Sequence, residues 1–182
     1  MEISKFNKFL LAIFTIGIIV WIGGSIVRTA IVYDIFEPVD RTLKFRYWVD
    51  EKIALMTVRH FAIGSLYTEI SFAIVLISTI LLFPTFVKYF RNEGWLFMSF
   101  ILLTLAFISE LVLMYFDIRL GLYVFFNQNI SYFSNEIQTF FFKRFTTYNF
   151  LIVYNWLAVF TIIFFVVFKP LRKKHEKQAT IR

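Results

Sequence analysis

The sequence contains no cysteine and only two histidines, His60 and His175. The lack of cysteine excludes disulfide scaffolds, iron–sulfur clusters, thiol redox chemistry and covalently attached c-type haem. Two histidines are too few for a bis-histidine haem bundle within one subunit. The sequence also lacks the metalloprotease, nucleophile-elbow, P-loop and dinucleotide-binding motifs. We therefore expect no enzymatic activity and no resident cofactor, and the sequence leaves any metal site unknown.

Charged residues are scarce, at 17% of the 182 residues, whereas hydrophobic residues make up 59% and phenylalanine alone contributes 26. Soluble domains carry about 25% charged and roughly 45–50% apolar residues. A soluble domain of this size could not cover so much apolar surface with polar groups. The composition therefore predicts an integral membrane protein with a single transmembrane domain over residues 1–182.

Four long apolar stretches dominate the chain. Each is close to the ~20 residues that an α-helix needs to cross the ~30 Å hydrocarbon core of a bilayer. The short alternating segments of a transmembrane β-barrel do not occur. We predict an all-α fold, an integral membrane four-helix transmembrane bundle, with spans at about residues 9–33, 61–83, 95–116 and 146–168. The remaining parts are the outer segments 34–60 and 117–145 and the basic tail 169–182.

The outer segments carry weaker signals. Residues 47–59 have a helical pattern that could continue into the second span, and Pro84 is expected to end that span. Residues 117–145 are rich in Phe, Tyr and Asn, which predicts a segment that lies at the membrane interface or packs against a partner.

Lysine and arginine density predicts the orientation. The two ends of the chain and the loop 84–94 hold ten Lys and Arg in 33 residues, against eight in the 56 residues of the other side. Both termini are therefore expected to be cytoplasmic, in a multi-pass protein of a bacterial cytoplasmic (inner) membrane. The positive excess lies beside the spans, which favours membrane lipids over nucleic acid as its partner. The expected headgroup-binding residues are Lys169, Arg172, Lys173 and Lys174.

Three ionisable residues interrupt the apolar spans. Each of Arg28, Glu69 and Glu110 costs roughly 2.5–3.5 kcal/mol on insertion scales. At 1.5 Å per residue they lie about 8–12 Å from the outer ends of their spans, so they fall in one layer. On the fourth span, Asn155 lies about 14 Å deep with Tyr148 above it on the same helical face. We predict that these five residues form one buried polar cluster.

The predicted cluster has two readings. Two carboxylates beside one arginine leave an excess negative charge, which either a proton or a cation would neutralise. Glu69 and Glu110, with Arg28 as counter-charge, would then handle protons or cations. Alternatively the cluster only fixes the register of the helices through hydrogen bonds and an ion pair.

Two further sets of residues are candidates for lesser roles. His60, with Met56 one turn earlier, could ligate a haem or a metal, or support a quinone site. Gly17, Trp21 and Gly24 share a face of the first span, where small residues allow close helix packing.

The leading functional hypothesis is a non-catalytic integral membrane subunit of a larger complex, such as a respiratory, secretion or transport assembly, with other membrane protein subunits as partners. It depends on the small size of the chain, its scarce catalytic residues and its aromatic outer segment. The alternatives are a small proton- or cation-coupled transporter and, more weakly supported, a haem- or quinone-associated membrane anchor.

Overall fold

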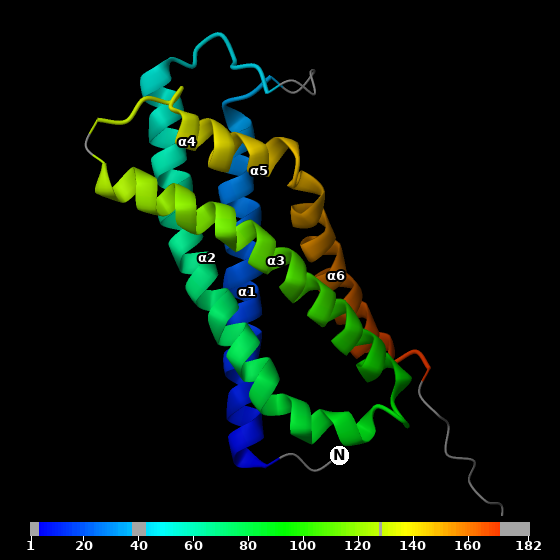
Figure 1. Cartoon of the computed structure of the whole chain (residues 1–182). Coiled ribbons are helices and arrows are strands. Elements are labelled where there is room, and N and C mark those ends of the chain that lie inside the picture. Colours follow the sequence, from blue (N-terminus) through cyan, green and yellow to red (C-terminus); the bar gives the residue numbers. More distant parts are fainter. Residues whose placement is uncertain (1–3, 38–42, 128, 172–182) are drawn as a thin grey trace, which may run out of the picture.

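The computed structural model describes residues 4–37, 43–127 and 129–171, and this part of the chain is almost entirely helical (Figure 1). Four of its helices are long and apolar enough to cross a membrane. They are α1 (Lys5–Asp34), α2 (Glu51–Phe86), α3 (Gly94–Phe126) and α6 (Asn149–Phe168). Shorter pieces are the 3-10 turn η1 (Val87–Tyr89), α4 (Asn135–Ile137), the π-helical turn η2 (Gln138–Phe142) and α5 (Lys143–Thr146). The all-α class and the four long apolar helices expected from the sequence are confirmed.

Side-chain caps set the starts of the first two long helices. The Ser4 hydroxyl accepts a hydrogen bond from the amide of Asn7 (3.2 Å), and the Asp50 carboxylate accepts one from Ile53 (2.7 Å). The helix expected before the second span is therefore continuous with it from residue 51 onward. Pro84 was expected to end this helix but lies inside it, because α2 continues for two more residues before it ends at Phe86.

Helix α3 is the largest departure from the predicted spans. It continues ten residues past Phe116, so its 33 residues reach about 50 Å. The extension is helical because Leu120, Gly121 and Val124 recur at helical spacing and are buried against the rest of the molecule. Asp117 therefore lies on the same continuous helix as Glu110.

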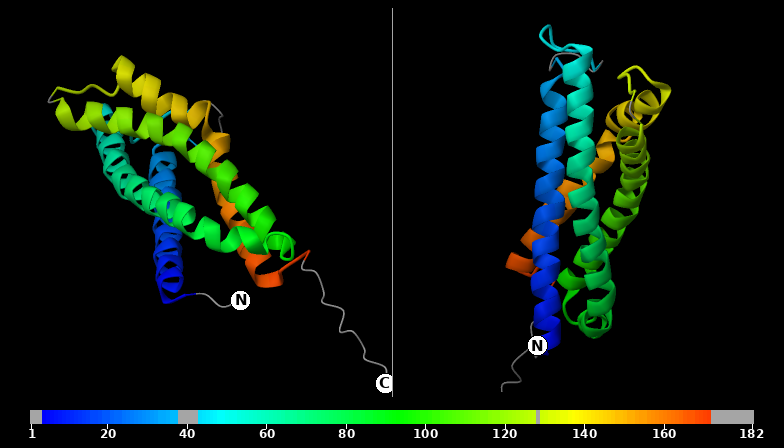
Figure 2. Two further views of the ribbon diagram at one scale, coloured as in Figure 1. Left: turned by 60° about the horizontal axis from the view of Figure 1, so that its bottom comes forward. Right: turned by 90° about the vertical axis from the view of Figure 1, so that its left-hand side faces the viewer.

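The long helices form two hairpins. Helix α1 packs mainly against α2 and α3 packs mainly against α6, while α2 and α3 provide most of the contact between the hairpins (Figure 2). Helix α1 begins and α6 ends at the same end of the molecule, which we call the terminal end (Figure 1). There the Gly94 amide donates to the Leu171 carbonyl (3.3 Å).

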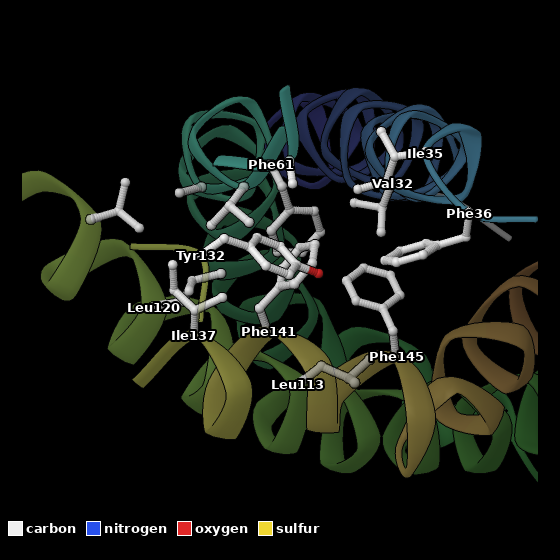
Figure 3. Packing of buried hydrophobic residues seen from close by; sticks show 14 of the residues in the cluster. Val32, Ile35, Phe36, Phe61, Leu113, Leu120, Tyr132, Ile137, Phe141 and Phe145 are labelled. Carbon is white, nitrogen blue, oxygen red and sulfur yellow. The ribbon is translucent and has the colours of Figure 1, made fainter. Parts of the chain in front are cut away.

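Residues 129–146, which we call the cap, cover the opposite end. In the structure the cap packs on its own bundle, and the expectation that residues 117–145 lie at the membrane interface or against a partner stays a prediction. Phe141 and Phe145 contact the Phe61 ring of α2, with ring centroids 5.6 and 5.3 Å apart (Figure 3). The Ser131 hydroxyl donates to the Glu51 carboxylate (2.6 Å), which fastens the cap to the start of α2. The buried Phe side chains of the cap explain this packing, because exposing them would cost roughly 1.5–3 kcal/mol each.

Candidate functional site: a buried charge network

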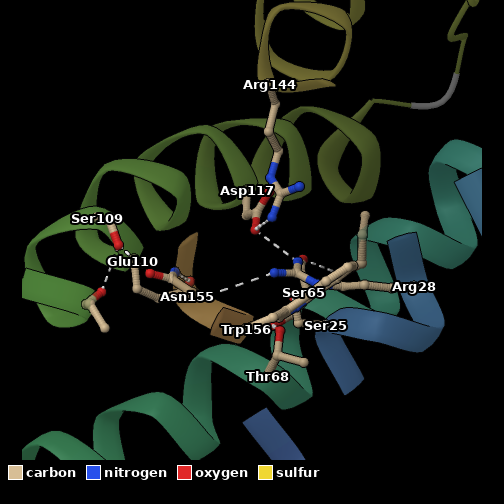
Figure 4. A network of polar contacts seen from close by, with 12 residues as sticks. Ser25, Arg28, Ser65, Thr68, Ser109, Glu110, Asp117, Arg144, Asn155 and Trp156 are labelled. Carbon is tan, nitrogen blue, oxygen red and sulfur yellow. Dashed lines mark hydrogen bonds and ion pairs between the residues drawn. The ribbon is translucent and has the colours of Figure 1, made fainter. Parts of the chain in front are cut away.

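Charged side chains from three elements meet where the cap covers the bundle (Figure 4). Arg28 extends from α1, Asp117 and Glu110 from α3, and Arg144 from α5. Seven residues separate the two acids, which is about two helical turns, so both face the same side of α3. All four residues are at most 3% exposed.

Asp117 bridges the two arginines. Its Oδ2 accepts hydrogen bonds from Arg28 Nη1 (2.7 Å) and Arg144 Nη2 (3.1 Å). Its Oδ1 lies 2.5 Å from Arg144 Nε. Burial lowers the pKa of the Arg144 guanidinium, and the adjacent Asp117 carboxylate counteracts this effect by favouring the charged form. The single carboxylate therefore joins the cap to α1 and α3.

The Phe61 ring of α2 lies beside both guanidinium groups. The Cζ atoms of Arg28 and Arg144 are each 4.9 Å from its centroid. Cations at this distance are attracted to the negative face of an aromatic ring, and the attraction is stronger where water is excluded. Helix α2 thus contributes an aromatic ring, whereas α1, α3 and α5 contribute charged side chains.

Glu110 and Asn155 connect the network to α6. Asn155 Nδ2 donates to Glu110 Oε2 (2.6 Å), and Glu110 Oε1 lies 4.0 Å from Arg28 Nη2. The Ser109 hydroxyl also hydrogen-bonds to the side-chain oxygen of Asn155. The network therefore reaches every long helix, with α2 contributing through Phe61.

The network holds more charged groups than we expected. We expected one arginine beside two carboxylates, Glu69 and Glu110, whereas the structure places two arginines, Arg28 and Arg144, beside Glu110 and Asp117. The difference arises because α3 continues past Phe116 and because the cap folds back over the bundle. Asp117 pairs closely with both arginines, whereas Glu110 lies 4.0 Å from Arg28. Nε and Nη2 of Arg28 and Nη1 of Arg144 have no hydrogen-bond partner among the described residues.

Glu69 is not bonded into this network, although it is close enough to interact electrostatically with Arg28 and Asp117. It is half-buried, and among the described residues it forms no hydrogen bond or ion pair. The buried face of α2 runs through Phe61, Ser65 and Thr68, so Glu69 lies at the edge of that face. Ser65 and Thr68 donate their hydroxyl hydrogens to carbonyls of their own helix (2.8 and 2.9 Å).

Tyr148 also lies outside the network. It precedes the first residue of α6, so it does not continue the helical face of Asn155 as expected. Its ring packs against Phe116, with centroids 4.8 Å apart. Of the five residues predicted to cluster, the structure brings together Arg28, Glu110 and Asn155.

The residues predicted as ligands and packing contacts lie in different settings. Met56 and His60 are both exposed on α2, and no group of three His, Cys, Asp or Glu suited to a metal occurs within the described ranges.

Trp21 is fully buried, and its ring centroid lies 5.2 Å from that of Phe72. A Cβ atom on Gly17 or Gly24 would lie within 2.7 Å of an α2 side chain, so these glycines allow α1 to approach α2 closely.

Lys169 is exposed just after α6, in a left-handed backbone conformation (φ 47°). The other predicted headgroup ligands, Arg172, Lys173 and Lys174, lie outside the described residues.

Sequence reasoning missed Asp117 and Arg144 as members of the network. Asp117 has a detectable signal, because it follows Glu110 by seven residues on one helical face. Arg144 has a weaker one, an arginine next to Lys143 among the four phenylalanines of residues 140–145. Its burial depends on how the cap folds, which the local sequence does not specify.

No protein-family model, curated protein or solved structure matches this chain significantly. Functional inference therefore depends on the geometry described above.

Proposed function

We propose that this chain is a non-catalytic integral membrane subunit of a larger membrane protein complex, such as a respiratory, secretion or transport assembly. The observation that carries the proposal is the buried ion-pair network that joins the cap to the long helices. Asp117 holds both Arg28 and Arg144, and Asn155 of α6 donates to Glu110. Buried ion pairs and hydrogen bonds between helices fix their packing, which favours a scaffolding role.

The partner surface that we propose is at the cap end. Three aromatic side chains there are strongly exposed: Tyr47 by 98%, Phe126 by 80% and Phe133 by 67%. Aromatic residues are enriched at protein–protein interfaces, because they bury a large area at low entropic cost. A partner that covers the start of α2, the end of α3 and the cap would bury all three.

We further propose that the protein resides in a bacterial cytoplasmic membrane with both termini cytoplasmic. The density of lysine and arginine at the terminal end supports this orientation, since such residues are enriched on the cytoplasmic side. The cap and its aromatic side chains would then face the opposite side.

Native purification tests the subunit proposal. The protein is extracted from its host membrane in a mild detergent, and co-purifying chains are quantified. We expect at least one partner at stoichiometric level. The double variant Tyr47→Ser/Phe133→Ser should lose this partner, whereas the control Phe168→Ser, exposed by 72% at the other end, should retain it. A lone monomer or simple homodimer would overturn the proposal.

A small proton- or cation-coupled transporter is a second candidate, and Glu69 is the observation that favours it. This half-buried carboxylate lies within the apolar part of α2, and its Oε1 has no hydrogen-bond partner among the described residues. Such groups inside a membrane are typical of ion pathways. In proteoliposomes, Glu69→Gln should abolish a pH-dependent or cation-dependent flux and leave the fold intact. If the unaltered protein supports no flux in proteoliposomes, the transporter candidate is excluded.

A further inference from the structure

An apolar cavity of about 350 Å³ lies between the two hairpins at the terminal end. Residues from all four long helices line it, including Leu11 of α1, Phe83 of α2, Leu103 of α3 and Ile162 of α6. Leu103 is buried, whereas Phe83 is 38% exposed, so the cavity has a buried floor and reaches the surface. This volume is within the ~300–1,000 Å³ range of ligand pockets.

A second apolar cavity is adjacent to the first. It has a volume of about 260 Å³, shares Thr79, Phe83 and Phe100 with the first, and is also lined by Phe107 near the middle of α3. The rings of Phe83 and Phe100 contact each other where the two cavities adjoin, with centroids 4.9 Å apart. An apolar lining along α2 and α3 suits a hydrocarbon chain.

Four cations neighbour, in sequence, residues that line the first cavity, and we call them the rim. Lys88 lies between the lining residues Phe86 and Phe90, and Arg91 directly follows Phe90. Lys8 and Lys169 lie one turn from the lining residues Leu11 and Val166, towards the terminal end. All four cations are exposed.

One acid shares this rim. The carboxylate of Glu93 accepts a hydrogen bond from the indole of Trp95 (2.6 Å), which lines the cavity. With four cations and one acid, the rim remains strongly positive.

We propose that these adjoining cavities form a binding site for one acyl chain of an anionic phospholipid, with its headgroup held by the cations at the rim. The apolar lining would select the hydrocarbon chain, and the surrounding Lys and Arg would select a negative over a zwitterionic headgroup. Because α1, α2, α3 and α6 all line the cavity, the bound chain would join the hairpins where the charge network does not reach. The inference is independent of the partner assembly proposed above.

Native mass spectrometry of the detergent-solubilised full-length protein tests the preference for an anionic lipid headgroup. Phosphatidylglycerol and phosphatidylcholine with identical acyl chains are titrated separately. We expect one phosphatidylglycerol to be retained more tightly than phosphatidylcholine. In Lys88→Gln/Arg91→Gln, its affinity should fall by about fivefold for each cation removed. The matched control Lys52→Gln, an exposed lysine near the other end of α2, should bind as the unaltered protein does.

Photocrosslinking tests where the acyl chain of the lipid lies. A phosphatidylglycerol with a diazirine near the acyl terminus should label peptides that contain Thr79 and Leu103, and Ser99→Phe should fill the cavity and abolish this labelling. Because Ser99 is buried, the variant is first checked for unaltered helicity and thermal unfolding. If Ser99→Phe does not fold, the lipid titration of Lys88→Gln/Arg91→Gln decides the outcome.

Three results would overturn the proposal. They are equal retention of the two lipids, crosslinks spread over the lipid-facing surface, and dimers in which a second copy fills the cavity without lipid.

Discussion

Asp117 is the central residue of the network, because its carboxylate contacts both arginines. Taking charges out of water costs several kcal/mol per ion, and only close partners of opposite sign repay this cost. Arg28 and Arg144 share that one carboxylate and also the face of Phe61. Losing the carboxylate would leave two guanidinium groups close together, with Glu110 as the nearest remaining acid at 4.0 Å from Arg28.

We therefore predict that Asp117→Asn lowers the free energy of unfolding by about 3–5 kcal/mol, as removal of one partner from a buried ion pair does. The measurement is reversible unfolding in mixed detergent micelles. Asp34→Asn is the matched control, because Asp34 is mostly exposed and lies 3.8 Å from Arg46, so its loss should cost under about 1 kcal/mol. Equal losses of stability in the two variants would show that the network contributes no more to the free energy of unfolding than an exposed ion pair does.

At the scale of elements, the contact between α1 and α2 depends on glycine. A Cβ atom on Gly17 would lie 2.7 Å from Val75 Cγ2 and 3.3 Å from the Ser71 carbonyl oxygen. Without a large apolar force between helices in lipid, association depends on close packing, and small residues allow it. Gly23 lies on the exposed side of α1, where an added Cβ would meet no atom within 4 Å.

Gly17→Ala should therefore separate α1 from α2 and destabilise the protein by about 1–3 kcal/mol, as overpacking does. Gly23→Ala should cost nothing and could stabilise α1 by up to about 1 kcal/mol, because alanine has the higher helix propensity. Unfolding of both variants under the same conditions provides the comparison. A loss of stability in Gly23→Ala equal to that in Gly17→Ala would contradict this account.

The elements also show what the sequence could predict. Apolar length located the four long helices, because a helix of ~20 apolar residues is the simplest structure that satisfies its backbone in lipid. Depth along the spans, counted at 1.5 Å per residue, placed Arg28 and Glu110 in one layer. The structure does not bond Tyr148 or Glu69 to them, because Tyr148 precedes α6 and Glu69 lies at the edge of the buried face of α2. Arg144 was unpredictable, since its burial depends on tertiary packing of the cap.

At the scale of the whole molecule, the two ends are built differently. The cap end is closed by aromatic packing and by the charge network. The terminal end contains the apolar cavity and a rim of cations. If the positive-inside rule holds for this chain, the cap end faces away from the cytoplasm and the cavity opens toward the cytoplasmic leaflet. The orientation of the molecule thus determines which membrane surface each proposed partner must occupy.

Because the chain has no native cysteine, single cysteines can report this orientation without background. Tyr47 at the cap end and Asn92 at the terminal end are both exposed, so each tolerates substitution. In intact cells whose outer layers admit the reagent, a membrane-impermeant maleimide should label Tyr47→Cys at once. Asn92→Cys should react only after the cytoplasmic membrane is permeabilised. The unaltered protein controls for non-specific labelling, and the reverse pattern would place both ends of the chain outside. Labelling of both variants in intact cells would indicate mixed insertion, which the twofold difference in Lys and Arg density argues against.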